Sequence, residues 1–139
     1  MSFSDILKPR KEVLSGDGVE GIVDLENLRD AKGKHLEAKP QDFLDLTYPT
    51  ADIRCVLENL HQRFANPSRS AGLYLFEGYK GSGKSHLLLL VCHLAQHPEL
   101  AKAWLARHGI ECNLPKNIEV IPHKFIDFPL YALWDLIMK

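Results

Sequence analysis

The chain has 139 residues, 45% of them hydrophobic and 25% charged, a balance that favours a packed core over a disordered chain. Its formal net charge of -1 argues against a surface that coats nucleic acid by charge alone. The three cysteines are widely spaced without a CxxC pair, so we expect reduced thiols in a cytoplasmic protein. No signal peptide and no apolar run long enough to span a membrane is visible.

Residues 1–49 are rich in turn-forming residues, and "SGDGVEG" holds three glycines in seven positions. We expect an N-terminal extension that wraps a core elsewhere in the chain. A helix should follow with Thr50 as its N-cap. Its apolar face is predicted from residues at helical spacing: Ile53, Val56, Leu57, Leu60 and Phe64. The remainder, residues 50–139, is expected to be a partial P-loop nucleotide-binding domain.

A short strand is predicted next, because "LYLF" (residues 73–76) is an apolar run bounded by glycines. A helix should begin inside the following glycine-rich loop and run to about His97. Another should begin at Pro98 and end at Gly109, a typical C-terminal cap residue.

The last part of the chain contains a second strand candidate, "NIEVIP" (residues 117–122), and the start of a further helix, "FPLYALWDLIMK" (residues 128–139). Alternating strands and helices predict an α/β fold with a P-loop NTPase-like parallel sheet and flanking helices. Since the final helix is cut short, we expect an incomplete core and a chain that was once longer.

The central motif lies in "FEGYKGSGKSH", where four residues match G-x-x-x-x-G-K-[ST]: Gly78, Gly83, Lys84 and Ser85. Glycines let the backbone approach phosphates closely, and successive N–H groups then form an anion-binding nest. The following helix adds the positive end of its dipole. We expect Lys84 to bind the β- and γ-phosphates of ATP, and Ser85 to offer its hydroxyl to Mg²⁺.

The other loop residues are expected to bind nucleotide mainly through their backbone N–H groups: Tyr79, Lys80, Gly81, Ser82 and His86. The motif requires a strand before the loop and a helix after it. The alternative is a glycine turn between strand and helix without a ligand.

Hydrolysis needs an acidic residue that helps to hold magnesium, and a polar group that orients water. The candidate is Asp127 in "VIPHKFIDF", but Pro122 interrupts that run and polar residues precede "FID". A role as an acidic residue at a helix start fits Asp127 better. Binding is therefore predicted more firmly than catalysis, for which Lys84 is the candidate residue.

Two further features bear on ligand binding. His86, His93 and His97 lie near one face of the loop helix, but without a third ligand we expect a semi-polar stripe rather than zinc. Tyr48 and Pro49 could cover a nucleobase, although a packing contact at the helix start fits Tyr48 better.

Three stretches in this order carry a family resemblance: "ILKPRKEVLSG", "DLTYPT" and "FEGYKGSGKSHLLLLVCHLA". Together they resemble the N-terminal part of large AAA-like P-loop ATPases of prokaryotic phage-defence islands. These are encoded beside DNA methyltransferases, as in BREX and Pgl systems.

The resemblance implies a nucleotide-binding segment of an ATPase that acts with other defence proteins against foreign DNA. It implies nucleotide contacts at Gly78, Gly81, Gly83, Lys84 and Ser85, with ATP and Mg²⁺ as cofactors. Direct DNA contact stays open, although the net charge does not favour it. Two alternatives remain: a non-catalytic nucleotide-binding or assembly module, and an inactive truncated remnant of such an ATPase.

Overall fold

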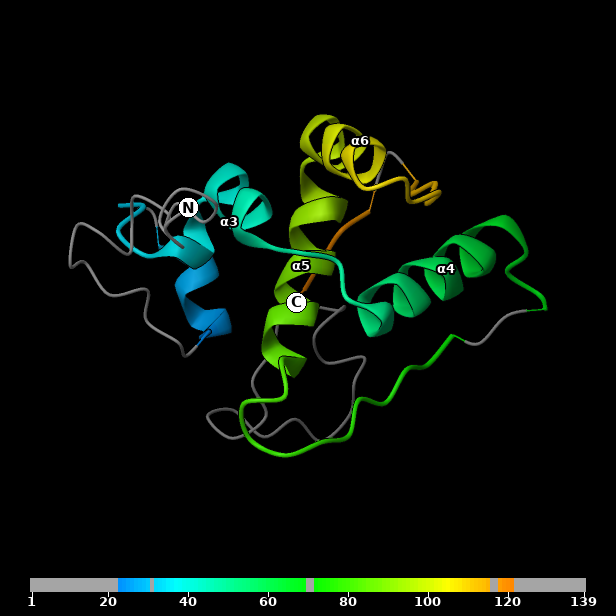
Figure 1. The fold of residues 1–139 in the computed structure, drawn as a ribbon, viewed down its shortest axis with the longest axis horizontal. Coiled ribbons are helices and arrows are strands. Elements are labelled where there is room, and N and C mark those ends of the chain that lie inside the picture. Colours follow the sequence, from blue (N-terminus) through cyan, green and yellow to red (C-terminus); the bar gives the residue numbers. More distant parts are fainter. Residues whose placement is uncertain (1–22, 31, 70–71, 116–117, 122–139) are drawn as a thin grey trace, which may run out of the picture.

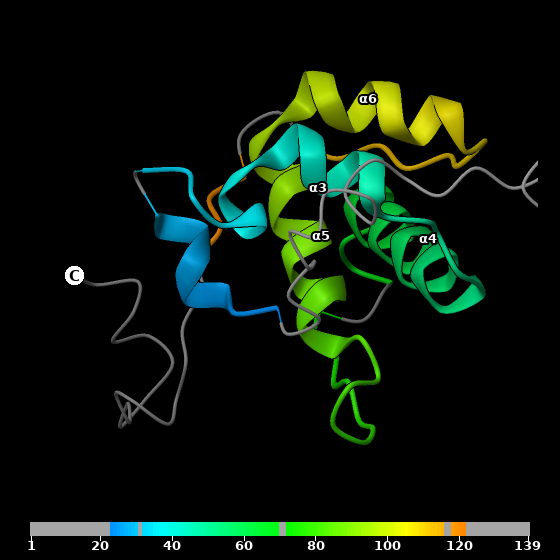
Figure 2. The same cartoon turned by 60° about the vertical axis from the view of Figure 1, so that its left-hand side comes forward.

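The computed structural model describes residues 23–30, 32–69, 72–115 and 118–121, and they form a small helical assembly. In chain order its elements are the 3₁₀ helices η1 (Leu25–Arg29) and η2 (Leu36–Ala38) and the α-helices α3 (Pro40–Leu46), α4 (Ala51–Ala65), α5 (Lys84–Gln96) and α6 (Pro98–Arg107). Helix α5 runs through the middle, between α3 with the 3₁₀ helices on one side and α4 on the other (Figure 1). Helix α6 crosses the C-terminal end of α5, next to α3 (Figure 2).

The hydrophobic core forms where these helices meet around α5, the most apolar of them. Its most deeply buried side chains come from each α-helix: Phe43 and Leu44 from α3, Leu57 from α4, Leu89, Leu90 and Leu94 from α5, and Trp104 from α6. Residues 40–46, which we assigned to an extension, therefore contribute directly to the core that positions the loop helix.

The predicted parallel-sheet α/β fold is wrong for the part of the chain that the structure describes. No β-strand occurs there, and residues 73–76, the expected buried strand, have no regular secondary structure. Leu73 and Leu75 are 84% and 81% exposed. A strand is stabilised by backbone bonds to a neighbour, and none of the described segments pairs with this one.

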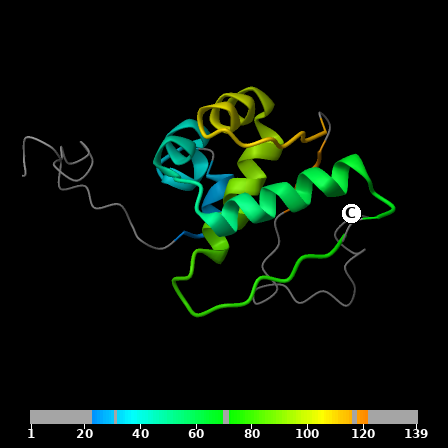
Figure 3. The ribbon, with the colours of Figure 1, turned by 45° about the vertical axis from the view of Figure 1, so that its right-hand side comes forward.

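The segment before the loop instead runs back alone from the far end of α4 to the start of α5 (Figure 3). Its burial alternates: Tyr74 and Phe76 are half-buried while Leu73 and Leu75 are exposed. Phe76 packs against the core, and the Tyr74 hydroxyl donates to the Asn59 carbonyl of α4 at 3.3 Å. Side-chain contacts on one side thus hold the segment where strand pairing was expected.

The helices predicted between residues 50 and 109 are present, although Phe64, expected on the apolar face of α4, is 37% exposed. Thr50 caps α4, since its hydroxyl accepts a hydrogen bond from the Ile53 N–H at 3.4 Å. Pro98 opens α6, and Gly109 follows its end with a left-handed φ of 61°. Of the second strand candidate, residues 118–121 have no regular structure. Residues 117 and 122, and the predicted helix at 128–139, lie outside the described residues.

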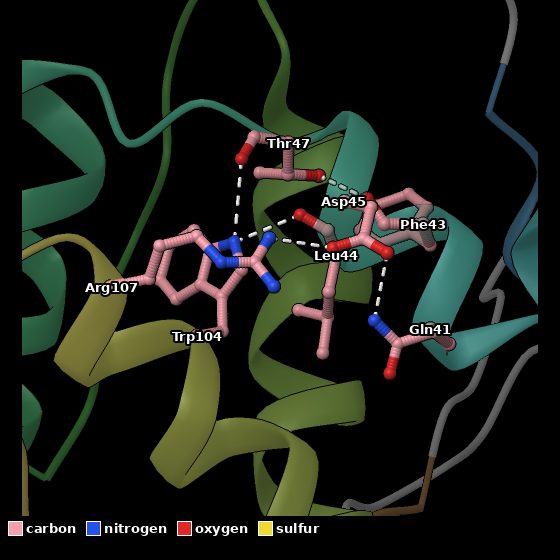
Figure 4. Close-up of polar contacts among 7 residues, drawn as sticks. All are labelled: Gln41, Phe43, Leu44, Asp45, Thr47, Trp104 and Arg107. Carbon is pink, nitrogen blue, oxygen red and sulfur yellow. Dashed lines mark hydrogen bonds and ion pairs between the residues drawn. The ribbon is translucent and has the colours of Figure 1, made fainter.

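The C-terminal end of α3 is a polar junction inside the core (Figure 4). The indole Nε1 of Trp104 donates to the carbonyls of Leu44 at 2.9 Å and Thr47 at 3.3 Å. On the surface above it, Arg107 and Asp45 form an ion pair with a 2.6 Å separation. These contacts join α3 to α6. Among the described residues, no helix has the length and apolar character needed to cross a membrane.

Candidate phosphate-binding loop

The loop between residue 78 and the first turn of α5 has backbone geometry that requires glycine. Gly81 and Gly83 have φ angles of 86° and 84°, in a region that side chains disfavour. A Cβ atom on either residue would meet no atom within 4 Å, whereas one on Gly78 would lie 2.8 Å from the Ser82 hydroxyl. Conformation therefore explains Gly81 and Gly83, and at Gly78, whose φ is 157°, the close approach of Ser82 adds a second reason.

Helix α5 begins at Lys84, as the sequence predicts, and its first turn presents unpaired donors. Its first hydrogen bond runs from the Leu87 N–H to the Gly83 carbonyl at 2.9 Å. The N–H groups of Lys84, Ser85 and His86 precede this bond and have no acceptor in the described part of the chain. Glycine at the N-cap leaves them without a side-chain cap. Such a helix start favours an anion.

The Lys84 ammonium lies over this loop. Its Nζ donates to the carbonyls of Gly78 at 2.7 Å and Tyr79 at 2.9 Å, and to the Ser82 hydroxyl at 3.1 Å. All three acceptors belong to the loop itself. The loop conformation thus holds a positive charge on the turn that leads into the helix start.

The remaining predicted residues lie around this charge and are accessible. Tyr79 is 93% exposed, and Lys80, Ser82 and Ser85 are also exposed. Lys80 makes no polar contact in the described part of the chain. The structure thus brings the predicted residues 78–85 together on one accessible turn.

The His86 side chain differs from the rest because it contacts α3. Its Nε2 lies 2.9 Å from the Thr47 hydroxyl, and its ring lies on that of Phe43 with a centroid distance of 4.6 Å. Burial lowers the pKa of His86. Sequence reasoning did not find this contact, since no periodicity relates residues that are 39 positions apart.

The expected semi-polar histidine stripe is only partly correct. His86 and His97 are half-buried, but His93 is only 1% exposed and neither ring nitrogen has a partner among the described residues. Burial lowers the pKa of His93, and the nearby Glu37 backbone, which is too poorly placed for a regular hydrogen bond, opposes part of this effect. The described residues contain no group of three potential metal-ligating side chains.

Tyr48 and Pro49, the candidates for covering a nucleobase, differ in their exposure. Pro49 is fully buried, while Tyr48 is 72% exposed and meets the His108 ring edge-on at 6.2 Å. Tyr48 therefore packs against the end of α6. Asp127, the weak candidate for a magnesium-linked acid, lies outside the described residues.

Comparisons with protein-family models, with curated proteins and with solved structures give no match for this chain. The resemblance to defence-island ATPases stays a prediction carried by the three sequence stretches.

Proposed function

We propose that this chain binds the polyphosphate of a nucleoside triphosphate, taken here as ATP, at residues 78–86. One observation carries the proposal. The Lys84 ammonium and the three unpaired N–H groups at the start of α5 belong to one exposed, glycine-shaped turn. Phosphate is recognised by an ammonium group and by backbone N–H groups at the N-terminus of a helix, where the helix dipole also favours negative charge.

The donor set fits ATP and magnesium. Lys84 and the N–H groups of Lys84, Ser85 and His86 would bind phosphate oxygens, and the exposed Ser85 hydroxyl would be available to Mg²⁺. When bound, the magnesium ion would neutralise phosphate charge. The strand that the motif requires before the loop is absent from the described residues, so half of its expected context fails and the proposal rests on the loop and on the helix that follows it.

The family resemblance extends the proposal to the parent protein. We propose that the chain is the nucleotide-binding segment of a cytoplasmic AAA-like ATPase, which works with other defence proteins against foreign DNA. These assignments are supported only by the three sequence stretches.

Binding is tested by titrating the 139-residue chain with Mg·ATP in a calorimeter. The Lys84 ammonium is a charged donor in each of its three hydrogen bonds. Phosphate oxygens that replace these acceptors should therefore bind strongly. We expect Lys84→Ala to weaken ATP binding about tenfold or more. Lys80→Ala is the matched control, because it removes the same charge from the same exposed loop without removing a polar contact. Its affinity should stay within about threefold of the wild type.

Equal affinity of wild type and Lys84→Ala would overturn the assignment, as would the absence of binding by a folded wild-type chain. Phosphate release from ATP then separates the enzymatic alternatives. Release above background that Lys84→Ala abolishes would identify an ATPase. Tight binding without release would favour the non-catalytic module.

A further inference from the structure

We propose that His86 is a positioning residue, which fixes the first turn of α5 to the end of α3 through the Thr47 hydroxyl and thereby sets the direction of the phosphate-binding amides. This inference rests on the proposed function for its effect on ATP affinity, but the positioning itself can be measured without a ligand.

The hydrogen-bond direction follows from the acceptors. The Thr47 hydroxyl lies 2.8 Å from the Phe43 carbonyl and 2.9 Å from His86 Nε2. A carbonyl oxygen can only accept, so the single hydroxyl proton points to Phe43. His86 must then donate from Nε2 to Thr47. This bond fixes the tautomer of a neutral His86 and the orientation of its ring.

Thr47 is a rigid anchor for such a bond. It is 4% exposed, and its N–H donates to the carbonyls of Phe43 at 3.0 Å and Leu44 at 3.2 Å. Its own carbonyl accepts the Trp104 indole N–H at 3.3 Å (Figure 4). Two elements other than the loop helix therefore determine where the hydroxyl lies: α3 and α6.

His86 links this anchor directly to the loop. Within residues 78–86 of the described chain, it is the residue whose side chain bonds to another element, whereas the bonds of Lys84 stay inside the loop. Its backbone N–H is also the third unpaired amide at the start of α5. Movement of the ring would therefore turn a phosphate-binding donor, and the bond to Thr47 opposes that movement.

The test separates the hydrogen bond from general stability. Thr47→Val removes the hydroxyl at nearly constant shape, and His86→Phe keeps a ring on Phe43 but removes the donor. Thr47→Ser and His86→Gln are the conservative rescues, because each keeps its half of the bond. Thr50→Val is the matched control: it removes another threonine hydroxyl, which caps α4 and does not touch the loop helix.

Amide hydrogen exchange of the ligand-free chain is the first measurement. We expect Thr47→Val and His86→Phe to speed exchange of the Leu87 amide about fivefold relative to that of Leu90, since the loss of one neutral hydrogen bond loosens the turn. The two rescues and Thr50→Val should keep the wild-type ratio. An unchanged ratio in Thr47→Val, or the same change in Thr50→Val, would overturn the positioning role.

Affinity for Mg·ATP is the second measurement. Thr47→Val and His86→Phe should bind about fivefold more weakly, with Thr47→Ser and His86→Gln close to the wild type. If the wild type does not bind ATP, the proposed function fails and the exchange ratios alone decide the positioning role. If ATP binds with equal affinity to all five chains, the link between His86 and the phosphate site is refuted.

Discussion

Replacement of His93 by leucine should stabilise the protein, and the gain should grow as the pH falls. The wild-type imidazole is 1% exposed, and both ring nitrogens lack partners among the described residues. A buried polar group without a partner costs about 1–3 kcal/mol. Leucine has nearly the same volume, and a volume-conserving substitution in the core usually lowers the free energy of unfolding by less than about 1.5 kcal/mol. We therefore expect a net gain of about 1 kcal/mol at pH 7.5.

Acid should widen this difference. Burial lowers the pKa of His93 in the folded state, while in the unfolded chain it returns to about 6.5. Below that pH the unfolded state binds a proton that the folded state does not, so the free energy of unfolding falls as the pH falls. For one proton, the free energy of unfolding changes by at most about 1.36 kcal/mol for each pH unit. Between pH 6.5 and 5.0 the wild type should lose stability that His93→Leu retains.

Urea unfolding followed by circular dichroism at pH 7.5 and 5.0 measures both quantities. The reasoning is refuted if the difference between His93→Leu and the wild type is equal at the two pH values. A destabilised His93→Leu at pH 7.5 would indicate that the tilted contact of the His93 ring with Phe43, at a centroid distance of 5.1 Å, contributes more than its unpaired nitrogens cost.

Two further predictions concern the core. Trp104→Phe should lower the free energy of unfolding by about 2 kcal/mol or more, since it leaves the Leu44 and Thr47 carbonyls without their indole donor; a loss below about 0.5 kcal/mol in urea unfolding would contradict this. Iodoacetamide at pH 8 should modify exposed Cys55 rapidly and Cys112 only on unfolding, because burial raises the pKa of the Cys112 thiol to about 11. Equal labelling rates of these two cysteines in the folded chain, read by peptide mass spectrometry, would show that Cys112 is accessible.

The helices could be predicted because their signals are local. Thr50, Pro98 and Gly109 mark helix ends through their own hydrogen bonding or backbone preference, and apolar spacing fixes the buried faces. The strand prediction failed because strand pairing depends on a partner segment. Four apolar residues between glycines fit a buried strand, but the same residues can lie against α4 on one side only.

For the candidate site too, local features could be predicted from the sequence and contacts between helices could not. The loop conformation and the start of α5 follow from residues 78–85, since glycine positions and the adjoining helix are encoded within one short stretch. The contact between His86 and Thr47 and the burial of His93 arise from how α3 packs on α5. Such packing depends on the whole core, so the spacing of three histidines could not distinguish a surface stripe from a buried ring.

The junction at the end of α3 also constrains the order in which the chain can fold. Trp104 bonds to carbonyls 60 and 57 positions earlier in the chain, and His86 reaches back 39 positions to the same turn. Closing loops of this length lowers chain entropy before any contact compensates for it. During synthesis, α3 can contact α5 once residues 84–96 have emerged, but the two Trp104 bonds that complete the junction can form only after residue 104 has followed.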